Sequence, residues 1–228
     1  MKPIIGIVSR PQLRDNGIKV DVINNMSRRA IIKNGGIPMG ILPTQDINYY
    51  DIEGKDMPKL TDEEKEDIIN QINKCDGILL QGGTRWYEYD EFITNYIIEN
   101  DIPSLFICMS MQLLNSMNYK NNGINYTLEK IGGHRSDEDY VHDINIKEDS
   151  FLYKILGKNK IKVNSLHSYA VVDSDLNVIA TSSEGIIEGV DMMNKRFIVG
   201  LQWHPEKMID FDEDANKVFK YFINKCKK

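Results

Sequence analysis

Short apolar runs alternate with helical patterns through the first half of this chain. The run Ile4-Ile-Gly-Ile-Val8 is continuously apolar, which is typical of a strand covered on both faces. Similar strands are expected at residues 37–42, 76–81 and 105–107. Helices are expected between and after them, at residues 20–33, 61–72, 88–100 and 109–117. This order predicts an α/β fold, in which a doubly wound, mostly parallel sheet with right-handed crossovers is flanked by helices.

The pattern changes from about Tyr126 onward, where short strand-like runs follow one another without a long helix between them. These runs lie at residues 141–146, 160–163, 170–172, 177–181, 185–190 and 197–202. Such spacing predicts a small antiparallel or mixed extension of the sheet in the C-terminal half. One or two helical turns are expected at 150–156, and a final helix at 212–226 packs its apolar face on the core.

Turn and capping signals mark the ends of several elements. Gly35-Gly36 ends the helix predicted at 20–33, and residues 9–17 before that helix are expected to form a polar loop. A long acidic loop is expected to run through Asp56. Thr61-Asp-Glu-Glu64 is a capping-box pattern that opens the next helix.

Length and charge narrow the classes of protein to which the chain can belong. No Ser/Gly-rich or Pro-rich linker divides the 228 residues, so we expect a single domain over 1–228. The net charge is −6 and the basic residues are scattered, which argues against a nucleic-acid partner. No apolar run is long enough to cross a bilayer, and the first residues run straight into a strand without a signal region.

Cysteine usage indicates a reducing compartment. Cys75, Cys108 and Cys226 are odd in number and have no metal-ligand spacing, so neither a disulfide framework nor a zinc site is expected. These features together predict a soluble protein of the cytoplasm.

Cys108 lies at the junction between a predicted strand and a predicted helix. A residue at such a junction forms a nucleophile elbow, a sharp turn that lifts its side chain out of the carboxyl edge of the sheet. The thiol there faces the N-terminus of the next helix, whose positive dipole end favours a thiolate. The alternative is that Cys108 is a small buried hydrophobic residue, the usual role of a free cysteine.

A histidine and a carboxylate follow the last predicted strand, in Trp203-His-Pro-Glu206. Pro205 favours an extended conformation at His204, and residues two apart in extended chain face the same way. Glu206 is therefore expected to orient the ring of His204, and with Cys108 the three residues would form a nucleophilic triad. The alternative is that His204 and Glu206 are an exposed pair at the end of a strand.

Several separated motifs, in order, resemble those of the class I glutamine amidotransferase superfamily. The resemblance extends over nearly the whole chain and is strongest to the γ-glutamyl hydrolase branch (γ-glutamyl-γ-aminobutyrate hydrolase-like, peptidase C26). The motifs are Pro3-Ile-Ile-Gly-Ile, Gly35-Gly-Ile-Pro38, Asp76-Gly-Ile-Leu-Leu-Gln-Gly-Gly83, Ile107-Cys-Met-Ser-Met-Gln112, Val163-Asn-Ser-Leu-His-Ser168, Gly185-Ile-Ile-Glu188 and Gly200-Leu-Gln-Trp-His-Pro-Glu206. The resemblance implies a flavodoxin-like, glutamine amidotransferase-like fold.

The resemblance also implies an activity and the residues that carry it. Cys108 would be the nucleophile, His204 the general base and then acid, and Glu206 the residue that orients it. The substrate would be a small γ-glutamyl amide, either glutamine or a γ-glutamyl amine or peptide. The amide would be cleaved through a γ-glutamyl thioester, without a metal or an organic cofactor.

Two further groups of residues follow from the resemblance. The oxyanion hole would consist of the backbone N–H groups of Met109 and Gly83, with Gly82 as the alternative donor. The pocket for the glutamyl part of the substrate would be lined by Gln112, His167 and Ser168. Related proteins are often dimers, so a homodimer is among the expectations.

The chain departs from the family pattern around the elbow. Phe106 and Ser110 stand where the family has glycine, and Met109 stands where the hydrolase branch commonly has arginine. The loop after Gly83 is shorter than in the family, so the substrate cannot be copied from any one relative. His134 and His142 belong to no pattern that assigns them to the site.

Three functions therefore remain open at this stage. The first is a stand-alone cysteine hydrolase of γ-glutamyl amides, favoured by the absence of a synthase domain from the sequence. The second is a glutaminase subunit that passes ammonia to a separate synthase partner. The third is a degenerate relative that binds a glutamyl compound without turnover, suggested by Phe106 and Met109.

Overall fold

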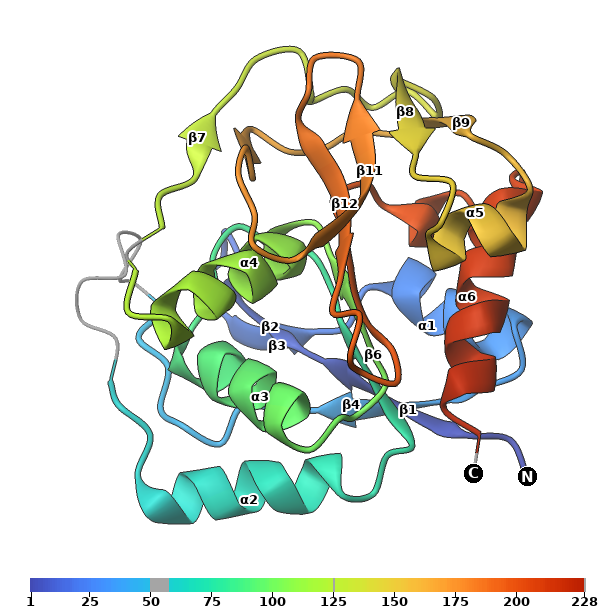
Figure 1. Cartoon of the computed structure of the whole chain (residues 1–228). Coiled ribbons are helices and arrows are strands. Elements are labelled where there is room, and N and C mark those ends of the chain that lie inside the picture. Colours follow the sequence, from blue (N-terminus) through green and yellow to red (C-terminus); the bar gives the residue numbers. More distant parts are fainter. Residues whose placement is uncertain (50–57, 125, 228) are drawn as a thin grey trace.

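A mixed sheet of nine strands forms the centre of the molecule (Figure 1). The computed structural model describes residues 1–49, 58–124 and 126–227, and within them the strand order is β4-β1-β5-β6-β13-β12-β11-β8-β9. The parallel part consists of β4 (Ile37–Ile41), β1 (Ile4–Val8), β5 (Gly77–Leu80), β6 (Ser104–Ile107) and β13 (Ile198–Leu201). The antiparallel extension consists of β12 (Ile187–Asp191), β11 (Asn177–Ser182), β8 (His142–Ile146) and β9 (Lys160–Val163).

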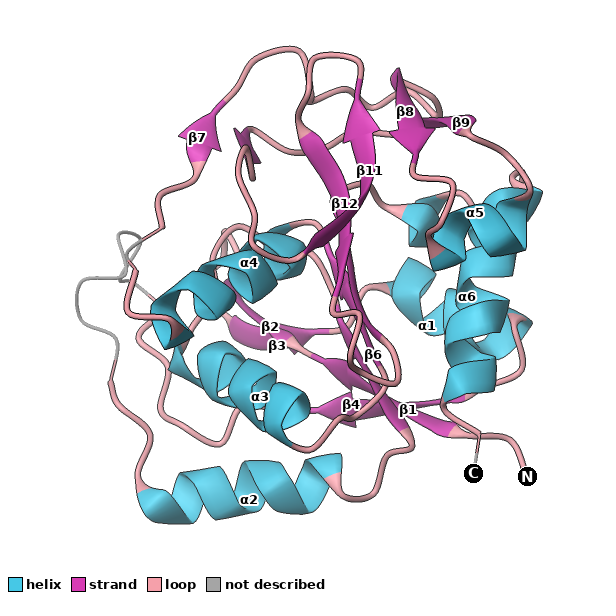
Figure 2. Ribbon diagram, in the orientation of Figure 1, coloured by secondary structure: helices cyan, strands magenta, loops and turns pink. Residues whose placement is uncertain are grey.

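Helices cover both faces of this sheet (Figure 2). One face packs against α1 (Asn25–Lys33), α5 (Phe151–Leu156) and α6 (Glu213–Lys225). The other packs against α2 (Asp62–Ile72), α3 (Glu88–Glu99) and α4 (Met109–Asn121). Strand side chains alternate between the two faces, so Leu79 and Leu105 lie in the first core and Ile78 and Phe106 in the second. The predicted fold class is confirmed.

The capping box predicted at the start of α2 is present. The hydroxyl of Thr61 accepts a hydrogen bond from the backbone N–H of Glu64 at 3.2 Å. The carboxylate of Glu64 accepts one from the backbone N–H of Thr61 at 2.7 Å. These two bonds satisfy N–H groups that the first turn of a helix leaves without partners.

The predicted loop at residues 9–17 is wrong. It contains β2 (Arg10–Leu13), which pairs antiparallel with β3 (Lys19–Val22) around a turn at Gly17, whose φ is 79°. This ribbon is largely polar and partly exposed, so the sequence lacks the apolar pattern of a buried strand. Helix α1 consequently begins at Asn25 rather than near residue 20, and the side chain of Asn24 caps it.

A second difference concerns the strand predicted at 170–172. The observed strand β10 (Tyr169–Ala170) has two residues and pairs with β7 (Glu129–Lys130) outside the main sheet. The acidic loop predicted to run through Asp56 falls partly on residues 50–57, which lie outside the described residues. No helix in the described part of the chain is long and apolar enough to cross a membrane.

The register of three neighbouring parallel strands brings distant parts of the chain to one edge of the sheet. Leu80 of β5 is level with Phe106 of β6, and Ile107 of β6 is level with Leu201 of β13. The segments that leave these strands at their carboxyl ends therefore emerge side by side. Ligands of parallel α/β sheets bind at this edge.

Candidate active site

Cys108 forms a sharp turn between β6 and α4. Its backbone has φ 55° and ψ −112°, which is rare for a residue with a side chain, and it is the N-cap of α4. Its N–H donates to the carbonyl oxygen of Leu201 at 2.7 Å, so the turn is held by the neighbouring strand β13. The backbone thus has the form of the predicted elbow, with the thiol near the positive end of a 13-residue helix.

Phe106 stands where the family has glycine, and the structure shows how it is accommodated. Its side chain is fully buried in the core beneath α2, α3 and α4. Cys108 belongs to the core on the other face, although residues two apart in a regular strand would share a face. The positive φ at Cys108 breaks the alternation, so the ring of Phe106 fills the core without crowding the thiol.

His204 meets Cys108 from the end of β13. The ring of His204 lies close enough to the sulfur of Cys108 for the two to interact electrostatically, and its Nδ1 lies 2.7 Å from Oε1 of Glu206. Gly82 lies against both residues, since a Cβ added there would lie 2.8 Å from Cε1 of His204 and 3.3 Å from Cβ of Cys108. A side chain at Gly82 would push the two residues apart, so the close approach requires glycine.

Glu206 reaches His204 by a different route from the one expected. It lies in a short 3-10 turn, η1 (Pro205–Lys207), rather than in extended chain. Pro205 occupies the first position of this turn, where its missing N–H does no harm. The buried carboxylate of Glu206 accepts from Nδ1 and leaves Nε2 as the other nitrogen of the ring.

The environment of His204 favours its charged form. Burial opposes a positive charge on the ring, but the Glu206 carboxylate and then the sulfur of Cys108 outweigh burial. Together these interactions raise the pKa of His204 from 6.5 to about 10. An imidazolium beside a cysteine stabilises the thiolate, which is the nucleophilic form of sulfur.

The residues expected to form the oxyanion hole are neighbours in the structure. Met109 is the first residue of α4, so the helix supplies no acceptor for its N–H. A Cβ added at Gly83 would lie 3.2 Å from Cε of Met109. Gly83 is exposed, and its neighbour Gly82 lies against both His204 and Cys108.

Comparison with known proteins places the chain in a family. The family model for peptidase C26 matches residues 85–206 of the 228. The chain belongs to the peptidase C26 family. A presumed glutamine amidotransferase of Schizosaccharomyces pombe is 30% identical to this C26 chain over 87% of the chain and 80% of its own length.

The chain is also similar to other enzymes that act on glutamine or γ-glutamyl compounds according to their names. The γ-glutamyl-γ-aminobutyrate hydrolase PuuD of Escherichia coli is 31% identical over 59% of this chain and 58% of its own length. The glutaminase domain of Trypanosoma brucei CTPS, solved with bound acivicin, superposes with a TM-score of 0.64 at 16% identity. That superposition covers 98% of this chain and 93% of the domain, and it supports the fold assignment. The resemblance inferred from the sequence is confirmed.

Of the three residues expected to line the substrate pocket, two have side chains that are hydrogen-bonded within the protein. The side-chain nitrogen of Gln112 donates to the carbonyl oxygen of Tyr169 at 2.8 Å and to Oε1 of Gln202 at 3.0 Å. The ring of His167 donates from Nδ1 to the same carbonyl oxygen at 3.0 Å and faces Glu188. Ser168 is partly exposed. The contact of these residues with a substrate stays a prediction.

Sequence reasoning missed Asn164, which holds the backbone of His204. Its side chain accepts from the N–H of His204 at 2.8 Å and donates to the carbonyl oxygen of the same residue at 2.8 Å. Asn164 is buried and directly follows β9. The sequence did contain a signal for Asn164, because it is a polar residue directly after a predicted strand and lies within the motif at residues 163–168.

Arg10 was also missed because residues 9–17 were assigned to a loop. Its buried guanidinium pairs with Asp90 and donates to the carbonyl oxygen of Gln81 and to the hydroxyl of Ser110, both at 2.8 Å. The hydroxyl of Ser110 in turn donates to Gln81 at 2.9 Å. Arg10 therefore connects the segment before Gly82 to the first turn of α4, beneath the elbow.

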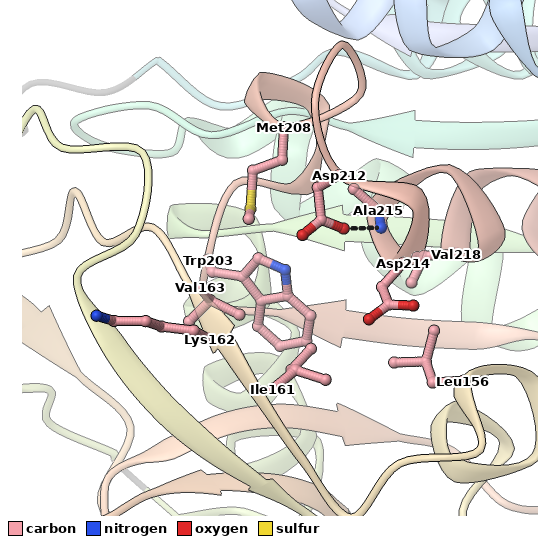
Figure 3. Close-up of a pocket in the computed structure, with 10 residues that line it drawn as sticks. All are labelled: Leu156, Ile161, Lys162, Val163, Trp203, Met208, Asp212, Asp214, Ala215 and Val218. Atoms are coloured by element: carbon pink, nitrogen blue, oxygen red, sulfur yellow. Dashed lines mark hydrogen bonds between the residues drawn. The ribbon is translucent and has the colours of Figure 1, made fainter.

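Trp203 lines a small pocket (Figure 3). The pocket is lined by Ile161, Val163 and Val218 among others, and it does not include Cys108 or His204. Trp203 itself is buried, so its ring anchors the segment that carries His204.

One group in the described residues has side chains arranged so that they could hold a metal ion. It consists of His134, His142, His167 and Glu188. Cys75, Cys108 and Cys226 are not disulfide-bonded, and none belongs to this group.

Proposed function

We propose that this C26 chain is a cysteine hydrolase that cleaves a γ-glutamyl amide bond through a γ-glutamyl thioester. The observation that carries the proposal is the meeting of Cys108, His204 and Glu206 at the carboxyl edge of the sheet. Membership of the peptidase C26 family supports the chemistry. The name of the E. coli relative supports the class of substrate.

In the first half of the reaction, the thiolate of Cys108 attacks the γ-carbonyl carbon of the substrate. The carbonyl oxygen becomes an oxyanion and accepts from the N–H groups of Met109 and Gly83. His204 gives its proton to the leaving nitrogen as the C–N bond breaks, so the amine departs neutral and the thioester remains. The raised pKa of His204 keeps that proton available at neutral pH.

In the second half, His204 acts as the base. It takes a proton from water as the water oxygen attacks the thioester carbon, and the C–S bond breaks to return the thiolate and release glutamate. Glu206 holds Nδ1 throughout, so Nε2 is the nitrogen that exchanges the proton. These steps need no metal or organic cofactor.

The glutamyl group would lie against Gln112 and the segment that carries His167 and Ser168. The side-chain nitrogen of Gln112 and Nδ1 of His167 both donate to the carbonyl oxygen of Tyr169, which fixes the outline of this wall. A preformed wall costs little entropy when the substrate binds.

An activity screen tests the proposal directly. Wild type and Cys108→Ala are incubated with glutamine and a panel of γ-glutamyl amines, and the released ammonia or amine is measured. We expect release by wild type alone, with one amine preferred. The absence of turnover and of binding for every compound in the panel would contradict the proposal.

A second candidate function keeps the chemistry but gives the product to a partner. The fold is shared with the glutaminase domain of T. brucei CTPS, which supports a glutaminase subunit that feeds ammonia to a separate synthase. This function predicts that glutamine is the preferred substrate and that a co-purifying synthase raises its turnover. Full activity on a γ-glutamyl amine by the chain alone would favour the stand-alone hydrolase.

A further inference from the structure

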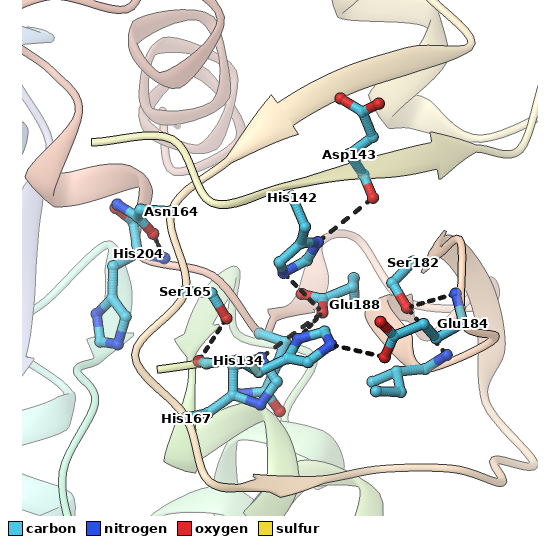
Figure 4. Close-up of polar contacts among 12 residues, drawn as sticks. His134, His142, Asp143, Asn164, Ser165, His167, Ser182, Glu184, Glu188 and His204 are labelled. Atoms are coloured by element: carbon cyan, nitrogen blue, oxygen red, sulfur yellow. Dashed lines mark hydrogen bonds and ion pairs between the residues drawn. The ribbon is translucent and has the colours of Figure 1, made fainter. Parts of the chain in front are cut away.

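Three histidine rings surround one buried carboxylate near the candidate active site (Figure 4). The cluster consists of His134, His142, His167 and Glu188, and one side-chain atom from each lies within 4.8 Å of all the others. His134 follows β7, His142 begins β8, His167 lies between β9 and β10, and Glu188 belongs to β12. His204 lies outside the cluster.

Two of the rings have their outer nitrogen fixed by a backbone carbonyl group. Nδ1 of His167 donates to the oxygen of Tyr169 at 3.0 Å, and Nδ1 of His142 donates to the oxygen of Asp143 at 3.3 Å. A carbonyl oxygen can only accept, so these Nδ1 atoms carry the hydrogen. In the neutral rings, Nε2 therefore presents a lone pair to the centre of the cluster.

The third ring is fixed by a carboxylate. Nε2 of His134 donates to Oε2 of Glu184 at 3.3 Å, which leaves Nδ1 facing the centre. Histidines that bind metals nearly always donate their other ring nitrogen to a carbonyl or carboxylate group. All three rings of the cluster have this arrangement.

The atoms that face the centre are buried and have no hydrogen-bond partner. They are Nδ1 of His134, Nε2 of His142, Nε2 of His167 and both carboxylate oxygens of Glu188. Neutral rings direct three lone pairs at a carboxylate, and fully protonated rings place three positive charges around one negative charge. A proton on one ring alone would pair that ring with Glu188 but leave the lone pairs of the other two rings unsatisfied. Burying unsatisfied polar groups or unbalanced charge is costly. A bound cation would satisfy the three ring nitrogens and one of the two carboxylate oxygens.

The distances from the carboxylate to the three rings fit a four-coordinate metal ion. Oε1 of Glu188 lies 3.5 Å from Nδ1 of His134, 3.4 Å from Nε2 of His142 and 3.6 Å from Nε2 of His167. Metal–ligand bonds of about 2.0–2.1 Å in a tetrahedron separate the ligand atoms by roughly 3.3–3.4 Å. The carboxylate oxygen is already near that separation from each ring, and the ring nitrogens, which lie within 4.8 Å of one another, would move closer together around an ion.

We propose that His134, His142, His167 and Glu188 bind one divalent transition-metal ion of the zinc class. Imidazole suits zinc and its neighbours, whereas calcium and magnesium prefer oxygen ligands. Four protein ligands complete a tetrahedral shell and leave no open position for a reacting water. The site is therefore structural, and the ion takes no direct part in the bond cleavage proposed for Cys108.

The position of the site suggests what the ion stabilises. The segment that carries His167 also carries Asn164, which holds the backbone of His204. The carbonyl oxygen of Glu188 accepts from the N–H of Gln202, two residues before His204. A metal at the cluster would join both supports of His204 and tie the segments bearing His134 and His142 to β12.

Metal binding is measured on the full chain after treatment with a chelator. The protein is titrated with zinc by calorimetry and with cobalt by visible spectroscopy. We expect one equivalent of either ion, a cobalt spectrum typical of tetrahedral coordination, and a rise in Tm with zinc. Loss of the outer partner in Glu184→Ala should weaken binding by about 10-fold. The ligand variants Glu188→Gln and His142→Gln should weaken it by more than about 100-fold.

The chain offers matched controls, because it has four histidines and three lie in the cluster. His204→Ala and Cys108→Ala remove the other candidate ligands at the sheet edge and should bind one equivalent as wild type does. Circular dichroism of each variant without metal checks that loss of binding is not loss of folding. The proposal is overturned if wild type takes up no stoichiometric metal. It is also overturned if folded Glu188→Gln and His142→Gln bind zinc as tightly as His204→Ala.

Discussion

The backbone of Cys108 holds a conformation that an ordinary residue avoids. A φ of 55° at a residue with a side chain costs on the order of 1–3 kcal/mol, so the surrounding structure must impose it. The hydrogen bond from the N–H of Cys108 to the carbonyl oxygen of Leu201, together with the start of α4, supplies that constraint. The result is a thiol presented to the ring of His204 at the edge of the sheet.

At the same scale, the charge on His204 can be measured. We predict that the ring nitrogens titrate with a midpoint near pH 10 in wild type, because Glu206 and Cys108 stabilise the imidazolium. Nitrogen-15 NMR of the histidine rings reports this midpoint. In Glu206→Gln it should fall toward 6.5, the usual value for histidine, and an unchanged midpoint would contradict the assigned cause.

The same shift contributes to stability in a defined pH range. The folded pKa of His204 lies above its unfolded value, so its protonation favours the folded state. This contribution is fully present below about pH 6.5 and is lost as the pH rises through about 10.

At the scale of elements, the segment between β9 and β10 holds the backbone of His204 in place. The buried side chain of Asn164 makes two hydrogen bonds to the backbone of His204, which is partly buried. Each such bond contributes about 1 kcal/mol to stability. Losing these bonds would also displace the catalytic base, and a small displacement of a base reduces the reaction rate strongly.

We predict that Asn164→Ala lowers kcat/KM by about 10- to 100-fold and lowers the free energy of unfolding by only about 1–3 kcal/mol. Steady-state kinetics and urea unfolding give the two values. Asn121→Ala, which removes an exposed bond to Asn95, is the control and should behave as wild type. Equal activity in both variants would show that the contact does not position His204.

The elements were predictable from the sequence to different degrees. The buried strands β1, β5 and β6 and the capped helix α2 followed from apolar runs and turn signals because burial on both faces leaves a clear pattern. The ribbon β2–β3 did not, because its partly exposed residues carry no apolar alternation.

Some residues of the candidate site were also predictable from the sequence, and others were not. Cys108, His204 and Glu206 were found from local motifs, whereas Arg10 and Asn164 act through contacts that only the packed sheet creates. The histidine cluster combines four separate segments of chain, so no spacing in the sequence could reveal it.

At the scale of the whole molecule, Arg10 joins parts of the fold that are distant in sequence. It pairs with Asp90 of α3 inside the protein, with side-chain exposures of 7% and 0%. Removing one partner of a buried pair leaves an uncompensated charge and costs about 3–5 kcal/mol.

We therefore predict that Asp90→Asn lowers the free energy of urea unfolding by about 3–5 kcal/mol. The matched control is Asp210→Asn, because Asp210 pairs with Arg29 where both side chains are about half exposed, and its loss should cost far less than that of Asp90. Similar costs for the two variants would contradict a structural role for the Arg10 network.

The central claim is that the sulfur of Cys108 carries the γ-glutamyl group during turnover. Rapid quenching of wild type with its preferred γ-glutamyl amide, followed by mass spectrometry of the digested protein, tests this claim most directly. We predict one γ-glutamyl adduct on the peptide that contains Cys108, and neither adduct nor amine release in Cys108→Ala. Amine release by Cys108→Ala at the wild-type rate, with no adduct on Cys108 in wild type, would contradict the account.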